Sequence, residues 1–169
     1  MYNYDGITPV IVSRPLNINN SDATISQFVD TFGNAGGLVI LICGFGSVNT
    51  TGIDILRVEE SDIDPVAASD EENNANFSII PGCDALSDTQ ADGSAKITYD
   101  ADSDNCATTF YIPLIGQRKR YMRIAFSNGA SGNCNFCCMG LILGEGGHGT
   151  PSVTSLAGAD GAIFRAVTT

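Results

Sequence analysis

The residues of this chain with the clearest chemical potential are its six cysteines. The run Cys134-x-x-Cys137-Cys138 has the spacing of zinc ligands. A four-ligand site would need another cysteine or His148, and the sequence has no second Cys-x-x-Cys pair. Cys137 and Cys138 would also point to opposite faces of a strand. We therefore expect packed free thiols, which behave as small apolar side chains. The alternatives are this zinc site or a disulfide among three cysteines: Cys83, Cys106 and Cys134.

A second candidate site is the acidic run Asp100-x-Asp102-x-Asp104, whose carboxylates have the odd spacing of a calcium-binding loop. The sixth position of such a loop is Asn105 here instead of glycine, and the twelfth is Tyr111 instead of glutamate. We therefore expect a solvated acidic turn, with a weak calcium site as the alternative. No cofactor is expected.

Half of the eight basic residues lie in one short segment: Arg118, Lys119, Arg120 and Arg123. Consecutive positions on a strand alternate between faces, so these side chains do not make one basic patch. The net charge of −11 argues against nucleic acid or an anionic membrane as the ligand. Most acidic residues lie between positions 54 and 104. We expect the basic residues to pair with these carboxylates, in the same subunit or across a subunit contact.

The sequence has no Gly-x-Ser-x-Gly motif, no phosphate-binding loop and no partnered nucleophile beside its single histidine. We therefore do not expect an enzyme. A small hydrolase is the alternative, and it would require an acid and a base that converge in the folded chain.

The elements that must position these residues are expected to be strands. Glycine is abundant, at 19 residues, and no window keeps a 3.6-residue period over three turns. Turn formers recur about every ten residues, which favours an all-β, jelly-roll-like sandwich of about eight strands. The expected strands are 37–46, 53–60, 77–80, 96–99, 108–115 and two arms within 117–144.

The segment 117–144 is predicted to form a β-hairpin around the turn formers at 127–133. Its second arm, Cys137 to Leu143, is apolar on both faces, as a strand covered on both sides would be. The segment 21–32 is ambiguous: it can form a short helix capped by Ser21 or Asp22, or a strand, and we expect a strand.

The chain is expected to divide into an extended N-terminal arm (residues 1–20), a β-sandwich domain (21–144) and a C-terminal tail (145–169). The arm could also be an edge strand, because its prolines cannot donate to a ladder. The tail would dock on its own or a neighbouring subunit. The first ten residues lack the basic and apolar regions of a signal peptide, so we expect synthesis in a cytoplasm. The longest apolar run, 38–43, is too short to span a bilayer.

Three segments together resemble a known group. They are Val29-Asp-Thr-Phe-Gly33, Leu56-Arg-Val-Glu-Glu-Ser-Asp62, and Ile115-Gly-Gln-Arg-Lys-Arg-Tyr-Met-Arg-Ile124 with the glycine-rich turn after it. In order and spacing they resemble the small β-sandwich proteins encoded beside the major capsid protein of tailed bacteriophages, and the tail from Pro151 to Arg165 is similar too. The resemblance implies a decoration or cement protein on the exterior of the virion capsid, made in the host cytoplasm, with no catalytic residues.

The expected function is therefore to stabilise contacts between capsomers, with the major capsid protein and further copies of the chain, as a dimer or trimer, for partners. Eleven residues are the interface candidates: Val10, Ile11, Val12, Leu16, Arg118, Lys119, Arg120, Arg123, Ile163, Phe164 and Val167. The alternative is a carbohydrate-binding sandwich on the virion surface for host adhesion. Its weakness is that the five tyrosines are scattered and tryptophan is absent.

Overall fold

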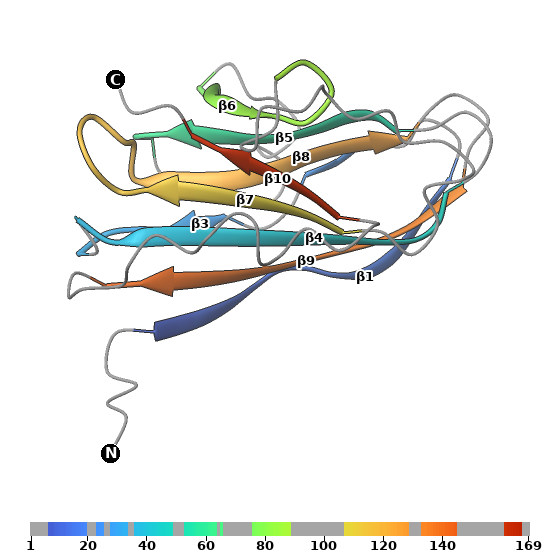
Figure 1. Cartoon of the computed structure of the whole chain (residues 1–169), viewed down its shortest axis with the longest axis horizontal. Coiled ribbons are helices and arrows are strands. Elements are labelled where there is room, and N and C mark those ends of the chain that lie inside the picture. Colours follow the sequence, from blue (N-terminus) through green and yellow to red (C-terminus); the bar gives the residue numbers. More distant parts are fainter. Residues whose placement is uncertain are drawn as a thin grey trace.

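The computed structural model describes residues 7–19, 23–25, 28–33, 36–48, 53–63, 65, 76–88, 107–128, 133–144 and 161–166. Within these residues every regular element is a strand, and the strands form a β-sandwich of two layers (Figure 1). The predicted all-β sandwich is therefore confirmed. No helix in this part of the chain is long and apolar enough to cross a membrane.

The ten strands follow one another without an intervening helix in the described residues. Their bounds are β1 Ile7–Asn19, β2 Ala23–Ile25, β3 Val29–Asp30, β4 Leu38–Val48, β5 Ile53–Ser61, β6 Ser78–Asp84, β7 Ala107–Pro113, β8 Tyr121–Asn128, β9 Asn133–Leu143 and β10 Gly161–Arg165.

The first sheet, here called sheet A, has the strand order β1-β9-β4-β7-β10. The second, sheet B, has the order β2-β8-β5-β6, and β3 also pairs with β8. Neighbouring strands are antiparallel except β10, which runs parallel to β7. The chain therefore changes sheets repeatedly, and most pairings join segments far apart in sequence.

Several strands lie where the hydrophobic pattern predicted them. The apolar runs at 37–46 and 53–60 are β4 and β5, and 108–115 overlaps β7. The ambiguous segment 21–32 contains two short strands, β2 and β3, and no helix in its described residues. The expected strand 96–99 lies outside the described residues.

Strand β6 is longer than predicted, because it continues through Pro81 and Gly82 to Asp84. The strand lies at the edge of sheet B, where a residue without a backbone N–H is tolerated. Gly82 has φ of +81°, a conformation that glycine adopts at little cost. A register irregularity between Arg57 and Glu59 accompanies this distortion on the partner strand.

The predicted hairpin at 117–144 is wrong. Its two arms, β8 and β9, are both strands, but β8 belongs to sheet B and β9 to sheet A. β8 pairs with β5, and β9 lies between β1 and β4. The turn formers therefore connect the two layers instead of joining adjacent strands.

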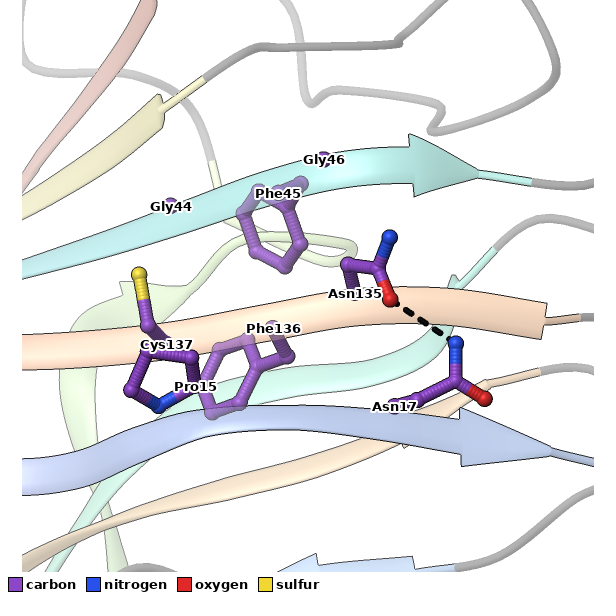
Figure 2. Close-up of a pocket in the computed structure, with 8 residues that line it drawn as sticks. All are labelled: Pro15, Asn17, Gly44, Phe45, Gly46, Asn135, Phe136 and Cys137. Carbon is purple, nitrogen blue, oxygen red and sulfur yellow. Dashed lines mark hydrogen bonds between the residues drawn. The ribbon is translucent and has the colours of Figure 1, made fainter.

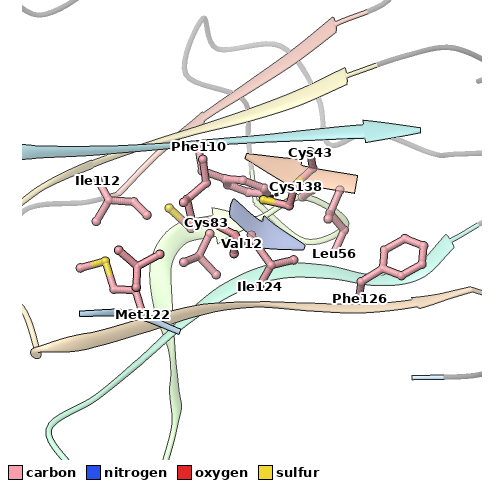
Figure 3. Packing of buried hydrophobic residues seen from close by; sticks show 14 of the residues in the cluster. Val12, Cys43, Leu56, Cys83, Phe110, Ile112, Met122, Ile124, Phe126 and Cys138 are labelled. Atoms are coloured by element: carbon pink, nitrogen blue, oxygen red, sulfur yellow. Dashed lines mark hydrogen bonds between the residues drawn. The ribbon is translucent and has the colours of Figure 1, made fainter. Parts of the chain in front are cut away.

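The N-terminal segment forms an edge strand, which is one of its two expected forms. Residues 7–19 are an edge strand of the sandwich, paired with β9 along its length apart from two register shifts. Val12 is 1% exposed and lies in the core (Figure 3), so it is not available to a neighbouring subunit. Val10 is half-buried and packs against the core. Alternation places one face of β1 against the core, as for any strand in a half-covered sheet.

The tail contributes β10, which pairs with β7 of the same chain from Gly161 to Arg165. Directly after β10, the Ala166 N–H donates a further hydrogen bond to the Tyr111 carbonyl oxygen of β7. The backbone of two interface candidates, Ile163 and Phe164, lies in this strand. Val167 is outside the described residues.

The core fills the space between the two sheets with large apolar side chains (Figure 3). An aromatic cluster joins the layers: Phe45 of β4, Phe126 of β8 and Phe136 of β9 are in mutual ring contact. Cys43 and Cys138 lie opposite each other on β4 and β9, and their sulfur atoms are 3.4 Å apart within this core. Sandwich stability therefore rests on contacts between layers that are distant in sequence.

Candidate binding surfaces

The four clustered basic residues bind carboxylates or a hydroxyl of their own chain. Arg118 Nη1 is 3.5 Å from Glu60 Oε1, and the Lys119 Nζ donates to Ser78 Oγ at 2.8 Å. The Lys119 backbone N–H also donates to Glu60 Oε2 at 3.2 Å. Pairing within the chain, one of the two roles expected for this cluster, is therefore present in the structure.

Among the four basic residues, Arg123 departs most from the expected interface role, because its side chain is buried. Glu59 lies directly opposite it on β5, also buried, and the Arg123 Nε donates to Glu59 Oε2 at 2.9 Å. Arg57 donates to the other carboxylate oxygen at 2.8 Å. The Phe77 ring covers the guanidinium, with its centroid 3.9 Å from Cζ, and Phe28 stacks on Phe77. The outer face of sheet B is thus charged and partly covered by the chain's own rings.

A shallow hollow of about 240 Å³ lies at one end of the sandwich, beside the start of β8. We call this region the loop end: residues 30–33, 62–63 and 114–120, drawn from three connections between strands. The connection from β7 to β8 is the loop at the left of Figure 1. Backbone hydrogen bonds hold the loops together, among them Thr31 N–H to the Arg120 carbonyl at 3.0 Å.

The loop end exposes three large apolar side chains. Phe32, which lines the hollow, is 76% exposed, and Ile63 and Ile115 are 56% and 48% exposed. Ile63 and Ile115 directly follow the lining residues Asp62 and Leu114. Exposed apolar groups gathered on loops are typical of protein interaction sites.

Arg120 contacts both an acidic and an aromatic side chain at the loop end. It donates to both carboxylate oxygens of Asp30, from Nε at 2.8 Å and from Nη2 at 2.7 Å, and its guanidinium lies 4.6 Å from the Phe32 ring centroid. The Arg120 hydrogen bond is the main reason that the pKa of Asp30 lies below its usual value. Partial burial opposes this shift, and the Phe32 N–H makes a further, smaller contribution that lowers the pKa. This bidentate pair holds Phe32 in an exposed position.

A second hollow, of about 550 Å³, lies on the outer face of sheet A (Figure 2). Its floor is open because β4 has Gly44 and Gly46 on this face, beside Cys137 and Asn135 of β9. A Cβ at Gly46 would lie 3.0 Å from the Asn135 Cβ, so the absence of a side chain permits the close approach of the strands. Asn17 of β1 donates to Asn135 Oδ1 at 2.8 Å at the rim.

This groove does not offer a sugar the aromatic platform that the carbohydrate alternative requires. The two aromatic residues in its lining, Phe45 and Phe136, are buried and belong to the core cluster. No described side chain on this face is an exposed aromatic ring.

The five described cysteines are free thiols, as predicted, and all but Cys137 are buried. Cys137 points to the outer face of sheet A and Cys138 into the core, as strand alternation requires. Among the residues that the structure describes, no group of three or more His, Cys, Asp and Glu side chains could hold a metal. Four candidates lie outside that part of the chain: Asp100, Asp102, Asp104 and His148. Cys106 does too.

Of the apolar interface candidates, only Ile11 has a described side chain that is well exposed. Leu16 pairs through its backbone with Phe136, in a register shift of β1. The sequence reasoning missed Phe32, Ile63, Ile42 and Met139. The signal that could have identified Met139 is the apolar character of both faces of β9, which implied a cover that the structure does not provide.

No protein-family model and no curated protein sequence matches this chain.

Proposed function

We propose that this chain is a structural protein of a tailed-bacteriophage head, a decoration or cement protein that binds the capsid exterior and stabilises the contacts between capsomers. The observation that carries the proposal is the order of strands. β1 pairs with β9, β2 and β3 with β8, β4 with β7, and β5 with β6. These nested pairs, distributed over two sheets, support a jelly-roll arrangement, in which a long hairpin is rolled into two layers, and viral capsid and lectin domains use that architecture.

The second support is the loop end. Its exposed Phe32 lines a hollow of about 240 Å³ together with Arg120, which pairs with Asp30. The exposed Ile63 and Ile115 directly follow two further lining residues. An apolar patch with a polar rim has the anatomy of a protein interface, and loops at one end of a rigid sandwich are common binding elements. We assign the contact with the major capsid protein to this end.

The mechanism would be mechanical. A protein that binds the assembled shell but not its dissociated subunits shifts the equilibrium towards the shell. Where several copies are linked, weak individual contacts persist because rebinding is intramolecular. The acidic surface, with a net charge of −11, keeps free copies soluble before they bind.

The test uses capsids assembled without this chain. Purified chain should co-sediment with them and raise the temperature at which they release DNA. Phe32→Asp should weaken binding at least tenfold, because it places a charge in the apolar centre of the patch. Ile79→Asp, at an exposed apolar position of β6, is the matched control and should bind as the unmodified chain does.

Failure of the unmodified chain to bind capsids would overturn the proposed function. Binding that survives Phe32→Asp would retain the function and remove the loop end from it. Binding to a glycan array, with none to capsids, would favour the carbohydrate alternative.

A further inference from the structure

The outer face of sheet A carries a row of exposed apolar side chains that neither the core nor the loop end uses. Ile11 of β1, Met139 of β9 and Ile42 of β4 are direct partners across three adjacent strands. They are 71%, 60% and 40% exposed, respectively. Side chains opposite each other on paired strands lie about 5 Å apart, so the three form one continuous strip.

The surroundings of this row are uncharged. A second row in register beside it, Pro9, Leu141 and Ile40, is apolar as well. None of the described side chains of sheet A carries a charge, and its five strands include only two charged residues in sequence, Arg14 and Arg165. The described carboxylates and their basic partners lie in sheet B and the connecting loops. Among the described side chains, those of sheet A are therefore uncharged, in contrast to those of sheet B.

The sequences of β4 and β9 indicate that this side is covered in the working assembly. Both strands are apolar on both faces, which is the pattern of strands buried from two sides. One face packs into the core, while Ile42 and Met139 on the other are exposed. Sheet B contrasts with this arrangement, because Phe77 covers Arg123 on its outer face.

We propose that the cover is a second copy of this chain, packed face to face on sheet A about a two-fold axis. Two molecules of net charge −11 repel each other, and the uncharged face lets them meet with their acidic sheets directed apart. A basic partner, by contrast, would be attracted to the acidic side. This inference does not depend on the proposed function.

The row is also self-complementary. Read across the strands it is Ile11, Met139, Ile42, and reversed it is again isoleucine, methionine, isoleucine. A two-fold axis that is parallel to β9 and lies midway between the two faces therefore places the two methionines together and each Ile11 against an Ile42, as an isologous contact allows. Methionine at the centre adapts its shape to such a contact.

The expected strength follows from the area. The row spans three strands, β1, β9 and β4, because Tyr111 on the same face of β7 is buried. Three strands spaced about 4.8 Å apart and about seven residues long present roughly 300 Å² of flat face. Standard interfaces bury about 800 Å² on each partner, so we expect a dimer that dissociates on dilution and not an obligate one.

The test is sedimentation velocity of the full chain from about 1 µM to about 200 µM, a range that brackets micromolar affinity. The mass should change from monomer to dimer across it. Met139→Glu places a like charge at the axis and should raise the dissociation constant at least 100-fold, leaving a monomer throughout. Ile79→Glu, an exposed apolar position of sheet B, is the matched control and should dimerise normally. Urea unfolding of each variant establishes that it is folded.

A second readout is oxidation of Met139 by dilute peroxide, followed by mass spectrometry. It should be fast in the monomer and slow at dimer concentrations, because the interface excludes the oxidant. A monomer at every concentration would overturn the proposal, whether Met139 is oxidised rapidly or is shielded by another segment of the same chain. A dimer that survives Met139→Glu would overturn it as well. If the chain is monomeric and Met139→Glu abolishes capsid binding, the capsid occupies this face, and the proposed function stands without the dimer.

Discussion

Phe126 of β8 stacks on Phe136 of β9, with ring centroids 4.4 Å apart and an angle of 8° between the planes. The two strands are consecutive in sequence but lie in opposite sheets, so this contact closes the sandwich at the point where a hairpin was expected. Phe45 of β4 touches both rings, at centroid distances of 5.9 and 5.6 Å. The cluster is thus a major link between the layers.

Phe136→Ala should therefore destabilise the fold strongly. Removing a buried phenylalanine leaves a cavity and typically costs about 3–5 kcal/mol. Asn135→Ala changes the neighbouring residue on the exposed face and should cost less than about 1 kcal/mol, since it loses one exposed hydrogen bond. Urea unfolding of both variants measures the difference, and equal losses would mean that the aromatic cluster does not hold the sheets together.

Glu59→Gln should also be destabilising, by about 3 kcal/mol or more, because it leaves the buried Arg123 guanidinium without its opposite charge. Asp54→Asn removes a carboxylate from the exposed side of the same strand and is the matched control, with an expected change within about 0.5 kcal/mol. Chemical denaturation gives both values. A mild effect of Glu59→Gln would indicate that the Phe77 ring alone is enough to hold the cation.

Asp30 should titrate below its usual pKa of 3.8 in the folded chain. Because the folded-state pKa is depressed, the stabilisation from the Arg120 pair is present above pH 3.8 and is lost as the pH falls through the folded-state value. Both groups are substantially exposed, so the effect on stability is small. Carbon-13 NMR of the carboxyl group measures the titration directly, and Arg120→Gln should move it back towards 3.8.

The described thiols should differ sharply in reactivity. Burial, then contact with the Cys138 thiol, raises the pKa of Cys43 well above its usual 9.0, and burial raises the pKa of Cys83 too. Both remain protonated in the folded chain at pH 8, whereas Cys137 lies beside an open groove. Maleimide labelling with mass mapping should therefore modify Cys137 first among the described cysteines. Rapid labelling of Cys43 or Cys83 in the folded chain would contradict the packing.

The same thiols predict a loss of stability at alkaline pH. In the unfolded chain they ionise near pH 9, but in the folded chain they retain their protons, so the folded state binds more protons there. The free energy of unfolding should therefore decrease as the pH rises above 9. Replacing Cys43 by alanine should flatten this decrease, as measured by urea unfolding at pH 7, 9 and 10.

The hydrophobic pattern alone was enough to place most of the central strands, but it did not predict the full length of β6 or the strand β10 in the tail. The unbroken apolar runs of β4 and β9, the acidic and glycine-rich connections and the absence of a helical period predict a two-layered β protein. Alternation also predicts that Cys137 and Cys138 face opposite sides. These properties are local, since they depend on residues within one strand.

Tertiary structure decided which strands pair. A pattern of period two specifies the two faces of a strand but not its neighbour. The sequence of residues 117–144 is therefore compatible with a hairpin and equally with two strands in opposite sheets. The same limit applies to Arg123, which becomes a buried ion-pair residue only because β5 places Glu59 opposite it, and to Met139, whose exposed row exists only because β1 and β4 flank β9. Composition and alternation are properties of the linear sequence, whereas the surfaces that can bind a partner arise from contacts between distant parts of the chain.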